Sequence, residues 1–168
     1  MTQMKSVKNM QGFSVIELII VIILLGILAV TAVPAFLSRD GIAEQRIQQE
    51  LLSALRLSQE RAMQDVNQRC YGIEFAAMSI RPYECGTAVP PEQVISVAGD
   101  VNVTVNSSVP NASTRWLFNS WGCPVSENHT VNAEPCGQSS VEIVITGTTM
   151  RYVCVQSQGY IRSGACST

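Results

Sequence analysis

Residues 12–37 read GFSVIELIIVIILLGILAVTAVPAFL, and this stretch determines how the rest of the chain is interpreted. Residues 18–36 within it contain no charged side chain, which meets the length expected of a membrane-spanning helix. Within residues 1–12, the only charged side chains are those of Lys5 and Lys8. Because positively charged flanks stay in the cytoplasm, we expect the short leader inside the cell and everything after Leu37 on the outer side of the membrane.

The composition of the 168-residue chain separates into two unlike parts. Only 14% of the residues are charged, below the roughly 25% of soluble domains, and much of this shortfall lies in the apolar stretch. The remainder is long enough for one domain of ordinary size. With a formal net charge of −2, the chain lacks the basic surplus of a nucleic-acid-binding protein, so we expect no nucleic-acid partner.

Glu17 is the one charged residue in residues 13–37, so its charge constrains where this apolar stretch can be buried. A carboxylate at the centre of a membrane helix costs about 2.5 to 3.5 kcal/mol, and less near the edge. Glu17 is therefore either solvated at the level of the lipid headgroups or paired with a positive charge. The apolar run of residues 13–37 is too long for an ordinary secretory signal peptide, whose apolar region spans about 7 to 15 residues. An uncleaved anchor and a leader cut at its boundary with the apolar run both stay open.

The segment around Glu17 closely resembles the leader of type IV pilins and type II secretion pseudopilins. It combines a short basic leader that ends in Gly12, then Phe13, then Glu17 four positions later, and a long apolar run that contains Gly26 and Pro34. The resemblance implies that a prepilin peptidase cleaves between Gly12 and Phe13 and methylates the new amine of Phe13. This cleavage would remove both lysines of the leader and change the formal net charge from −2 to −4.

The same resemblance gives roles to three residues of the helix. It implies that Glu17 neutralises the N-terminal amine of a neighbouring subunit when the helices pack into a fibre. It also implies that the helix loses structure between Gly26 and Pro34 on assembly. Because proline removes a backbone donor and clashes with the preceding turn, a static kink before Pro34 is equally compatible with the sequence.

After the apolar stretch, the sequence predicts an amphipathic helix over residues 38–66 that continues the first helix without a break. Apolar residues recur there mostly every four to five positions; they are Ile42, Ile47, Leu51, Leu55, Ala62 and Met63. From residue 67 onward the hydrophobic period shortens to two, which indicates strands separated by turns. We predict strands over residues 70–75, 79–84, 93–98, 101–106, 115–118, 141–146, 150–156 and 160–162, the last three forming a meander.

All six cysteines follow the apolar stretch. An even number on the translocated side of a membrane indicates disulfides formed in an oxidising compartment. Six cysteines allow fifteen connectivities, of which neighbour pairing is the simplest: Cys70 with Cys85, Cys123 with Cys136, and Cys154 with Cys166. The sequence contains no C-x-x-C motif and a single histidine, His129, so we expect no metal site.

No group of residues points to catalysis or to a cofactor. The sequence has neither a serine in a G-x-S-x-G context nor a phosphate-binding glycine loop, so we expect a protein that is not an enzyme and binds no cofactor. His129 lies in a polar stretch and is predicted to be a solvated surface residue. Trp116 and Trp121 are predicted to pack in the core or to contact another subunit.

Two later segments narrow the resemblance. ELLSALRLSQERAMQD and VCVQSQGYIRSG are similar to the GspH/FimT group of minor pilins and pseudopilins. PAFLSRDG, taken with LLSALRLSQERAM, is most similar to the minor pilins of the mannose-sensitive haemagglutinin (MSHA) pilus. The resemblance implies a subunit held in the inner membrane, with its C-terminal domain in the periplasm, that later enters an extracellular pilus used in adhesion.

We therefore expect an α+β protein with a cleaved leader (1–12), a transmembrane and assembly half-helix (13–37), an amphipathic half-helix (38–66) and a disulfide-linked domain (67–168). The long N-terminal helix is expected to pack on the antiparallel β-sheet of that domain. The partners implied by the resemblance are other pilin subunits, prepilin peptidase, the inner-membrane assembly platform and membrane lipid. A pseudopilin of type II secretion and a pilin that binds DNA or another ligand at the cell surface are the alternatives.

Overall fold

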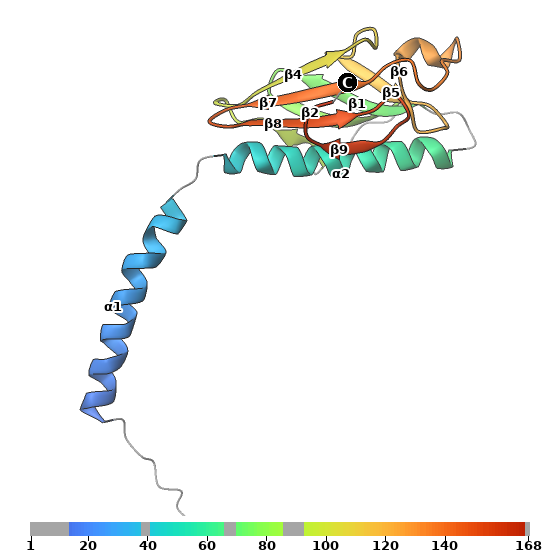
Figure 1. Cartoon of the computed structure of the whole chain (residues 1–168). Helices are drawn as coiled ribbons and strands as arrows, with labels where there is room; N and C mark the ends of the chain where they lie inside the picture. Colours follow the sequence, from blue (N-terminus) through green and yellow to red (C-terminus); the bar gives the residue numbers. More distant parts are fainter. Residues whose placement is uncertain (1–13, 38–40, 66–69, 86–92, 167–168) are drawn as a thin grey trace, which may run out of the picture. The chain divides into compact units, whose positions relative to one another are not determined.

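The computed structural model describes residues 14–37, 41–65, 70–85 and 93–166 (Figure 1). The chain divides into two compact units, Met1–Arg39 and Asp40–Thr168. The first contributes one helix, and the second contains a helix and all of the described strands. The α+β class expected from the sequence is confirmed.

The first unit contains helix α1 (Val15–Leu37), which runs through Pro34. The carbonyl of Ser14 accepts hydrogen bonds from the backbone N–H groups of Glu17 and Leu18. Glu17 thus lies in the first helical turn, where a carboxylate interacts favourably with the helix dipole. In the described part of the chain, none of the helices combines the length and the hydropathy that a membrane span needs.

The second unit begins with helix α2 (Ile42–Gln64), and Asp65 follows it as the C-cap residue. The sequence predicts one unbroken helix, but the structure has two, because Gly41 precedes α2 with φ +79°, in the left-handed region. Of the predicted apolar stripe of α2, Ile47, Leu51 and Leu55 are completely buried and Ala62 is 6% exposed. Ile42 and Met63, at the two ends of the predicted stripe, are instead 56% and 50% exposed. The expected end of the helix at Val66 lies outside the described residues.

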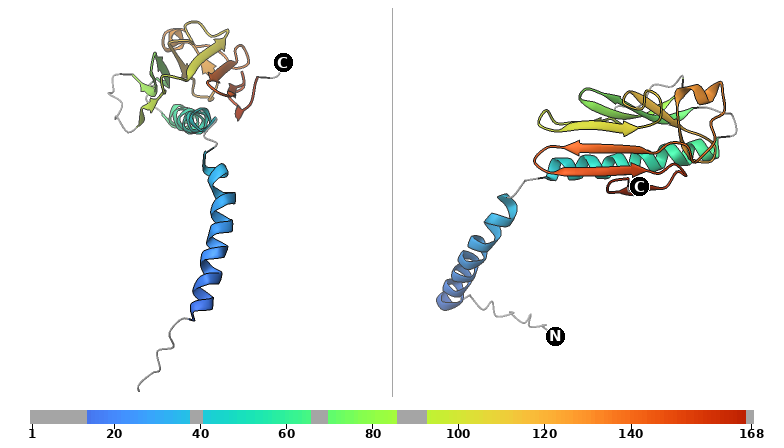
Figure 2. Two further views of the ribbon diagram at one scale, coloured as in Figure 1. Left: turned by 90° about the vertical axis from the view of Figure 1, so that its left-hand side faces the viewer. Right: turned by 45° about the horizontal axis from the view of Figure 1, so that its top comes forward.

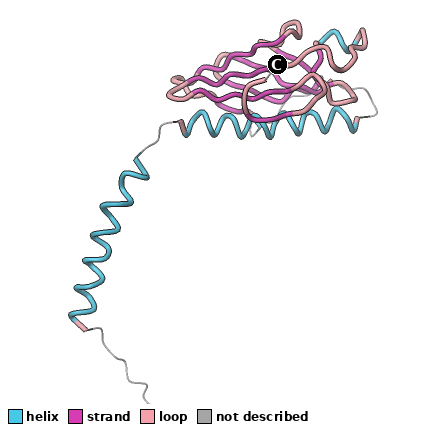
Figure 3. Tube along the Cα trace, in the orientation of Figure 1, coloured by secondary structure: helices cyan, strands magenta, loops and turns pink. Residues whose placement is uncertain are grey.

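Two antiparallel sheets follow α2, where the sequence suggests one (Figures 2 and 3). The first has the strand order β3 (Ile95–Ser96), β2 (Ser79–Glu84), β1 (Tyr71–Ala76), β5 (Arg115–Phe118) and β6 (Pro124–Val125). The second has the order β4 (Asn102–Ser107), β7 (Val141–Thr146), β8 (Met150–Val155) and β9 (Ile161–Ser163). A short 3₁₀ helix, η2 (Glu127–Thr130), follows β6. The last three strands form the predicted meander.

The core lies between α2 and the two sheets, and α2 contacts strands of both. Alternate residues of β7, namely Val141, Ile143 and Ile145, are completely buried. Gly72 on β1 allows an unusually close approach of β5, because a Cβ at this position would lie 2.0 Å from the carbonyl oxygen of Trp116. Any other residue at position 72 would push these paired strands apart.

Buried polar side chains fix α2 against the second sheet. Glu44 is 2% exposed, and its Oε1 accepts a hydrogen bond of 2.8 Å from the backbone N–H of Thr149 in the turn between β7 and β8. This hydrogen bond lowers the pKa of the Glu44 carboxyl below its usual value. One turn further along, Gln48 Nε2 donates to the carbonyl of Tyr152 at 2.8 Å. These bonds set the register of the helix on β8 and its preceding turn.

Three disulfides link neighbouring cysteines. Cys70 pairs with Cys85 beside the β1–β2 hairpin, Cys123 pairs with Cys136 across the segment that contains η2, and Cys154 on β8 pairs with Cys166. The paired residues are 15, 13 and 12 positions apart. A loop of this size contributes about 3 kcal/mol in the chain-entropy description. Cross-links of this kind support a domain with a modest core.

Candidate functional site

The sequence-predicted processing and assembly residues fall in or before α1. Gly12 and Phe13 lie outside the described residues. Glu17 lies in the first turn of α1. Gly26 lies in the middle of α1, and a Cβ at this position would have no atom within 4 Å apart from the adjacent residues and the backbone of the helix itself. Pro34 belongs to the helix, whose side chains are described from residue 14 to residue 29.

The described part of α1 is apolar and unshielded on all sides. Its large hydrophobic side chains, from Val15 to Leu28, are between 42% and 75% exposed. A helix that is hydrophobic all round normally lies in a lipid bilayer or in the core of a larger assembly. The physical demand on this helix is therefore burial against an apolar partner, with Glu17 as its acidic position.

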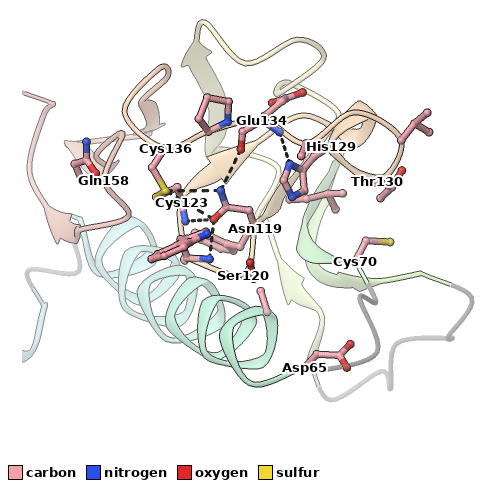
Figure 4. Close-up of a pocket in the computed structure, with 17 residues that line it drawn as sticks. Asp65, Cys70, Asn119, Ser120, Cys123, His129, Thr130, Glu134, Cys136 and Gln158 are labelled. Carbon is pink, nitrogen blue, oxygen red and sulfur yellow. Dashed lines mark hydrogen bonds between the residues drawn. A yellow bond between two sulfur atoms is a disulfide. The ribbon is translucent and has the colours of Figure 1, made fainter.

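The second unit contains a pocket of about 850 Å³ (Figure 4). The pocket is bounded by the C-terminal end of α2, the end of β5 and the segment from residue 119 to residue 136, and Gln158 contributes from the β8–β9 turn. Its size is within the range of small-molecule sites. Among the described residues that line it, the ionisable side chains are those of Asp65, His129 and Glu134.

Asn119 is 3% exposed and organises the wall of the pocket. Its Oδ1 accepts hydrogen bonds from the backbone N–H groups of Trp121, at 3.0 Å, and Cys123, at 2.9 Å. Its Nδ2 donates to the carbonyl of Glu134 at 3.3 Å. Gly122 adopts φ +79°, which favours glycine, and its N–H donates to the Asn119 carbonyl. A single buried amide therefore holds both sides of the segment that the Cys123–Cys136 disulfide closes.

His129 lies in η2 and is half-buried, which corrects the prediction of a solvated surface residue. Its Nδ1 accepts a hydrogen bond of 2.7 Å from the backbone N–H of Glu134, which places the proton of the neutral ring on Nε2. The Glu134 carboxylate accepts from the backbone N–H and the hydroxyl of Ser126. Because Ser126 donates to Glu134 and His129 accepts from the backbone, these three residues are not arranged as a nucleophile and its base.

Gln59 joins α2 to two turns beside the pocket. Its Nε2 donates to the carbonyl of Gly122 at 2.7 Å and to the carbonyl of Gly159 at 2.6 Å. Both glycines are buried. The residues next to them, Trp121 and Gln158, line the pocket. Gln59 therefore positions two separate parts of the pocket rim from one side chain.

The two tryptophans have opposite environments. Trp116 is completely buried and contacts Phe118 edge to face, with ring centroids 4.9 Å apart. Trp121 is 81% exposed and lies on the pocket rim. Val131, which is 83% exposed, also lies on the rim. The sequence offers core packing or a subunit contact for both tryptophans without separating them. The structure assigns the core to Trp116.

An ionic cluster that sequence reasoning missed supports η2 from outside the pocket. The guanidinium of Arg115 on β5 pairs with Glu74 on β1 at 2.5 Å and with Glu127 in η2. It also lies over the ring of Tyr83, 3.9 Å from the centroid. The hydrogen bond from Arg115 lowers the pKa of Glu74, and the same bond raises the pKa of Arg115. The cluster fixes the start of η2 to the first sheet.

Within the described residues, no group of three or more His, Cys, Asp or Glu side chains is arranged to hold a metal ion. The pocket has a wall held by the Asn119 hydrogen bonds, an exposed indole at Trp121 and several hydrogen-bonding groups. Such a surface is suited to binding a ligand or another protein.

Comparison with known proteins gives three findings. No curated protein matches the chain. Two crystal structures of the type IV minor pilin FimU from Pseudomonas aeruginosa (strain PAO1), in space groups P21 and P65, are similar at 14% sequence identity, with TM-scores of 0.48 and 0.47. The likeness covers 71% of this chain and 87% and 91% of the respective FimU chains. Residues 7–33 match the family described as the prokaryotic N-terminal methylation motif, so the N-terminal region of this chain carries that motif.

Proposed function

We propose that this protein is a minor type IV pilin that is cleaved between Gly12 and Phe13, methylated on Phe13 and incorporated into a pilus. The observation that carries the proposal is the match of residues 7–33 to the N-terminal methylation motif. The matched segment contains the proposed cleavage site and Glu17. The fold of a helix followed by an antiparallel sheet domain supports the same function.

The energetics of α1 explain why such a subunit assembles. Its apolar side chains are exposed, so they gain free energy from burial, first in the inner membrane and then against the helices of other subunits. Cleavage before Phe13 creates a new amine, and methylation leaves that amine able to carry a positive charge. In an apolar fibre core this charge and the Glu17 carboxylate are each tolerable only as a pair.

The proposed pairing fixes the axial position of one subunit relative to the next. Removing one partner of a buried ion pair costs about 3 to 5 kcal/mol, because the other charge stays buried without compensation. Neighbouring helices would therefore prefer the register that brings Glu17 of one subunit to the amine of Phe13 of another. Gly26 and Pro34 mark the segment of α1 that is proposed to lose helical structure when the fibre forms.

The disulfides and the sequence similarities bear on the cellular location of the protein and on the pilus or secretion system that it serves. The three disulfides suit a domain on the periplasmic side, where thiols are oxidised. Prepilin peptidase, the inner-membrane assembly platform, membrane lipid and other pilin subunits are the proposed partners. The similarity of residues 34–41 and 51–63 to MSHA minor pilins supports an MSHA-type pilus that functions in adhesion. A GspH-like pseudopilin of type II secretion is the second candidate.

Substitution of Glu17 tests the assembly mechanism. In the native host, we expect Glu17→Ala to be cleaved and retained in the membrane fraction, while its amount in sheared pili falls by at least about tenfold because an unpaired amine is left in the fibre core. Asp100→Ala is the matched control, since Asp100 is an exposed carboxylate in a turn of the second unit. Normal incorporation of the Glu17→Ala subunit would contradict the proposed role of Glu17.

A deletion strain separates the pilus from the secretion machine. A minor pilin of an adhesive pilus predicts loss of adhesion with normal export of folded proteins. A type II pseudopilin predicts the reverse. Complementation with the wild-type chain should restore whichever activity is lost.

A further inference from the structure

We propose that strand β4 pairs with the β4 strand of a second copy of this chain, so that two domains share one continuous antiparallel sheet. β4 is an edge strand of the second sheet, on the side away from α2 (Figures 1 and 2). In the described part of the chain, β7 is the one strand hydrogen-bonded to β4. Because the N–H and C=O groups of an antiparallel strand point alternately to its two sides, every second residue of β4 offers both groups to a further strand.

The other three edges of the two described sheets carry features that discourage pairing with another chain. β3 and β6 are two residues long, and β6 begins with Pro124, which has no N–H to donate. β9 is three residues long and contains Arg162. β4 has six residues and contains no charged residue, proline or glycine. Natural sheets protect their edges with short strands, charges and prolines, so the unprotected edge of β4 points to a strand that pairs there.

The exposure of the β4 side chains shows that this edge is open. One face of the strand, formed by Asn102, Thr104 and Asn106, is exposed to solvent. On the other face, Val103 and Val105 pack against the core and are only half-buried, whereas the core-facing residues of the neighbouring strand β7 are completely buried. A strand added beside β4 would therefore cover apolar area that the two valines leave accessible.

The sequence of β4 complements itself when two copies run antiparallel. A two-fold axis at Thr104 places this residue opposite the same residue of the second copy, and threonines in such positions hydrogen-bond across antiparallel strands. On the solvent face, asparagine amides that both donate and accept lie opposite each other. On the core face, valines oppose valines. The full set of pairs is Thr104 with Thr104, Asn102 with Asn106, and Val103 with Val105.

Charge and register favour the same arrangement. Residues 101–114 contain no charged side chain, so the pairing places no like charges opposite each other. A register centred on Val105 would pair as many residues, but it would place Val103 opposite Ser107 and lose one apolar pair. Because the two-fold axis uses the same edge of both copies, the assembly closes at two chains and leaves no free β4 edge.

Cross-linking of the full chain in detergent tests the contact. The three disulfides use all six cysteines, so one introduced cysteine is the only thiol of a variant. We expect a short bismaleimide to convert Thr104→Cys into a covalent dimer. Thr114→Cys is the matched control, because Thr114 is exposed in a turn outside β4, and its yield of dimer should be at least about tenfold lower. Both variants should keep the wild-type circular dichroism spectrum.

A second pair of variants tests the register. In the proposed pairing, Asn102 of one copy lies opposite Asn106 of the other, whereas the two Asn102 residues are about 13 Å apart along the strands. An equimolar mixture of Asn102→Cys and Asn106→Cys chains should therefore give at least about fivefold more cross-linked dimer than either variant alone.

Sedimentation velocity of the wild-type chain over a range of concentrations measures the affinity. One strand pair buries less surface than a standard interface, so we expect a reversible dimer with a dissociation constant in the micromolar range. Thr104→Lys places two like charges opposite each other and should raise that constant at least about tenfold. Thr114→Lys adds the same charge outside β4 and should stay within twofold of the wild type.

The proposal is overturned if the wild-type chain is monomeric throughout the concentration range. It is also overturned if Thr104→Lys associates as strongly as the wild type, which is the result expected of association through the apolar side chains of α1. Equal cross-linking of the asparagine variants alone and in mixture would overturn it as well.

Association of the solubilised chain is measured without a fibre. A monomeric wild-type chain therefore leaves the proposed pilin function intact, and normal assembly of Glu17→Ala leaves the pairing of β4 intact.

Discussion

Gln59→Ala is the substitution by which the structure of the second unit can be tested most sharply. The side chain donates two hydrogen bonds, to the carbonyls of Gly122 and Gly159, at 2.7 and 2.6 Å. Both acceptors belong to buried residues. Alanine keeps the helix propensity of α2 and removes both donors at once.

The expected loss follows from these two bonds. A typical intramolecular hydrogen bond contributes about 0.5 to 1.5 kcal/mol net, and leaving a buried acceptor without a partner favours the upper part of that range. The expected cost is therefore about 2 kcal/mol. For a domain of this size, about 4 °C of melting temperature corresponds to each kcal/mol, so the midpoint should fall by roughly 8 °C.

The assay is thermal unfolding of the full chain with intact disulfides, followed by circular dichroism in the same detergent for every variant. Gln49→Ala is the matched control, because Gln49 lies on the same helix with an exposed side chain, and it should change the midpoint by less than about 2 °C. Equal midpoints for the Gln59 and Gln49 variants would refute the tethering of the two turns.

Two further predictions concern pH and the disulfides. The pKa of Glu44 is lowered in the folded protein, so the stability that its carboxylate contributes is present above the unfolded pKa of about 4.3 and is lost as the pH falls through the lower folded value. The melting temperature of Glu44→Gln should therefore fall less on acidification than that of the wild type. An identical fall would contradict the role of the hydrogen bond between Glu44 and Thr149. Paired serine substitutions of Cys123 and Cys136, or of Cys154 and Cys166, should each cost about 3 kcal/mol in thermal unfolding. An unchanged unfolding free energy in either variant would contradict this contribution of the disulfides.

The elements that could be predicted from the sequence are those whose pattern is local. The central part of the apolar stripe of α2 and the alternation of Val141, Ile143 and Ile145 on β7 report directly which face is buried. The β7–β8–β9 meander follows from short turns between periodic strands. The N-terminal motif is likewise contiguous, since it lies within residues 7–33.

The features that could not be predicted depend on short or distant contacts. The break before α2 depends on one glycine, Gly41, in a left-handed conformation. Strand β6 has two residues and begins with Pro124, so its pattern is too short to detect. The pocket combines residues from Ala62 to Gln158, and no local pattern brings the end of α2 beside the disulfide-closed segment.

The environments of the two tryptophans illustrate the same limit. Trp116 is on β5, where the alternation of the strand and the close approach at Gly72 place it inside the core. Trp121 is only five positions away, but a turn organised by Asn119 directs it outward. The buried asparagine that makes this difference has no sequence signal of its own.

The most direct test of the central claim is the intact mass and N-terminal residue of the protein purified from its native host. Processing at the proposed site predicts a chain that begins at Phe13 and carries one additional methyl group on its N-terminal amine. A chain that retains Met1, or one that begins at Phe36, would contradict the assignment of this protein as a processed pilin subunit.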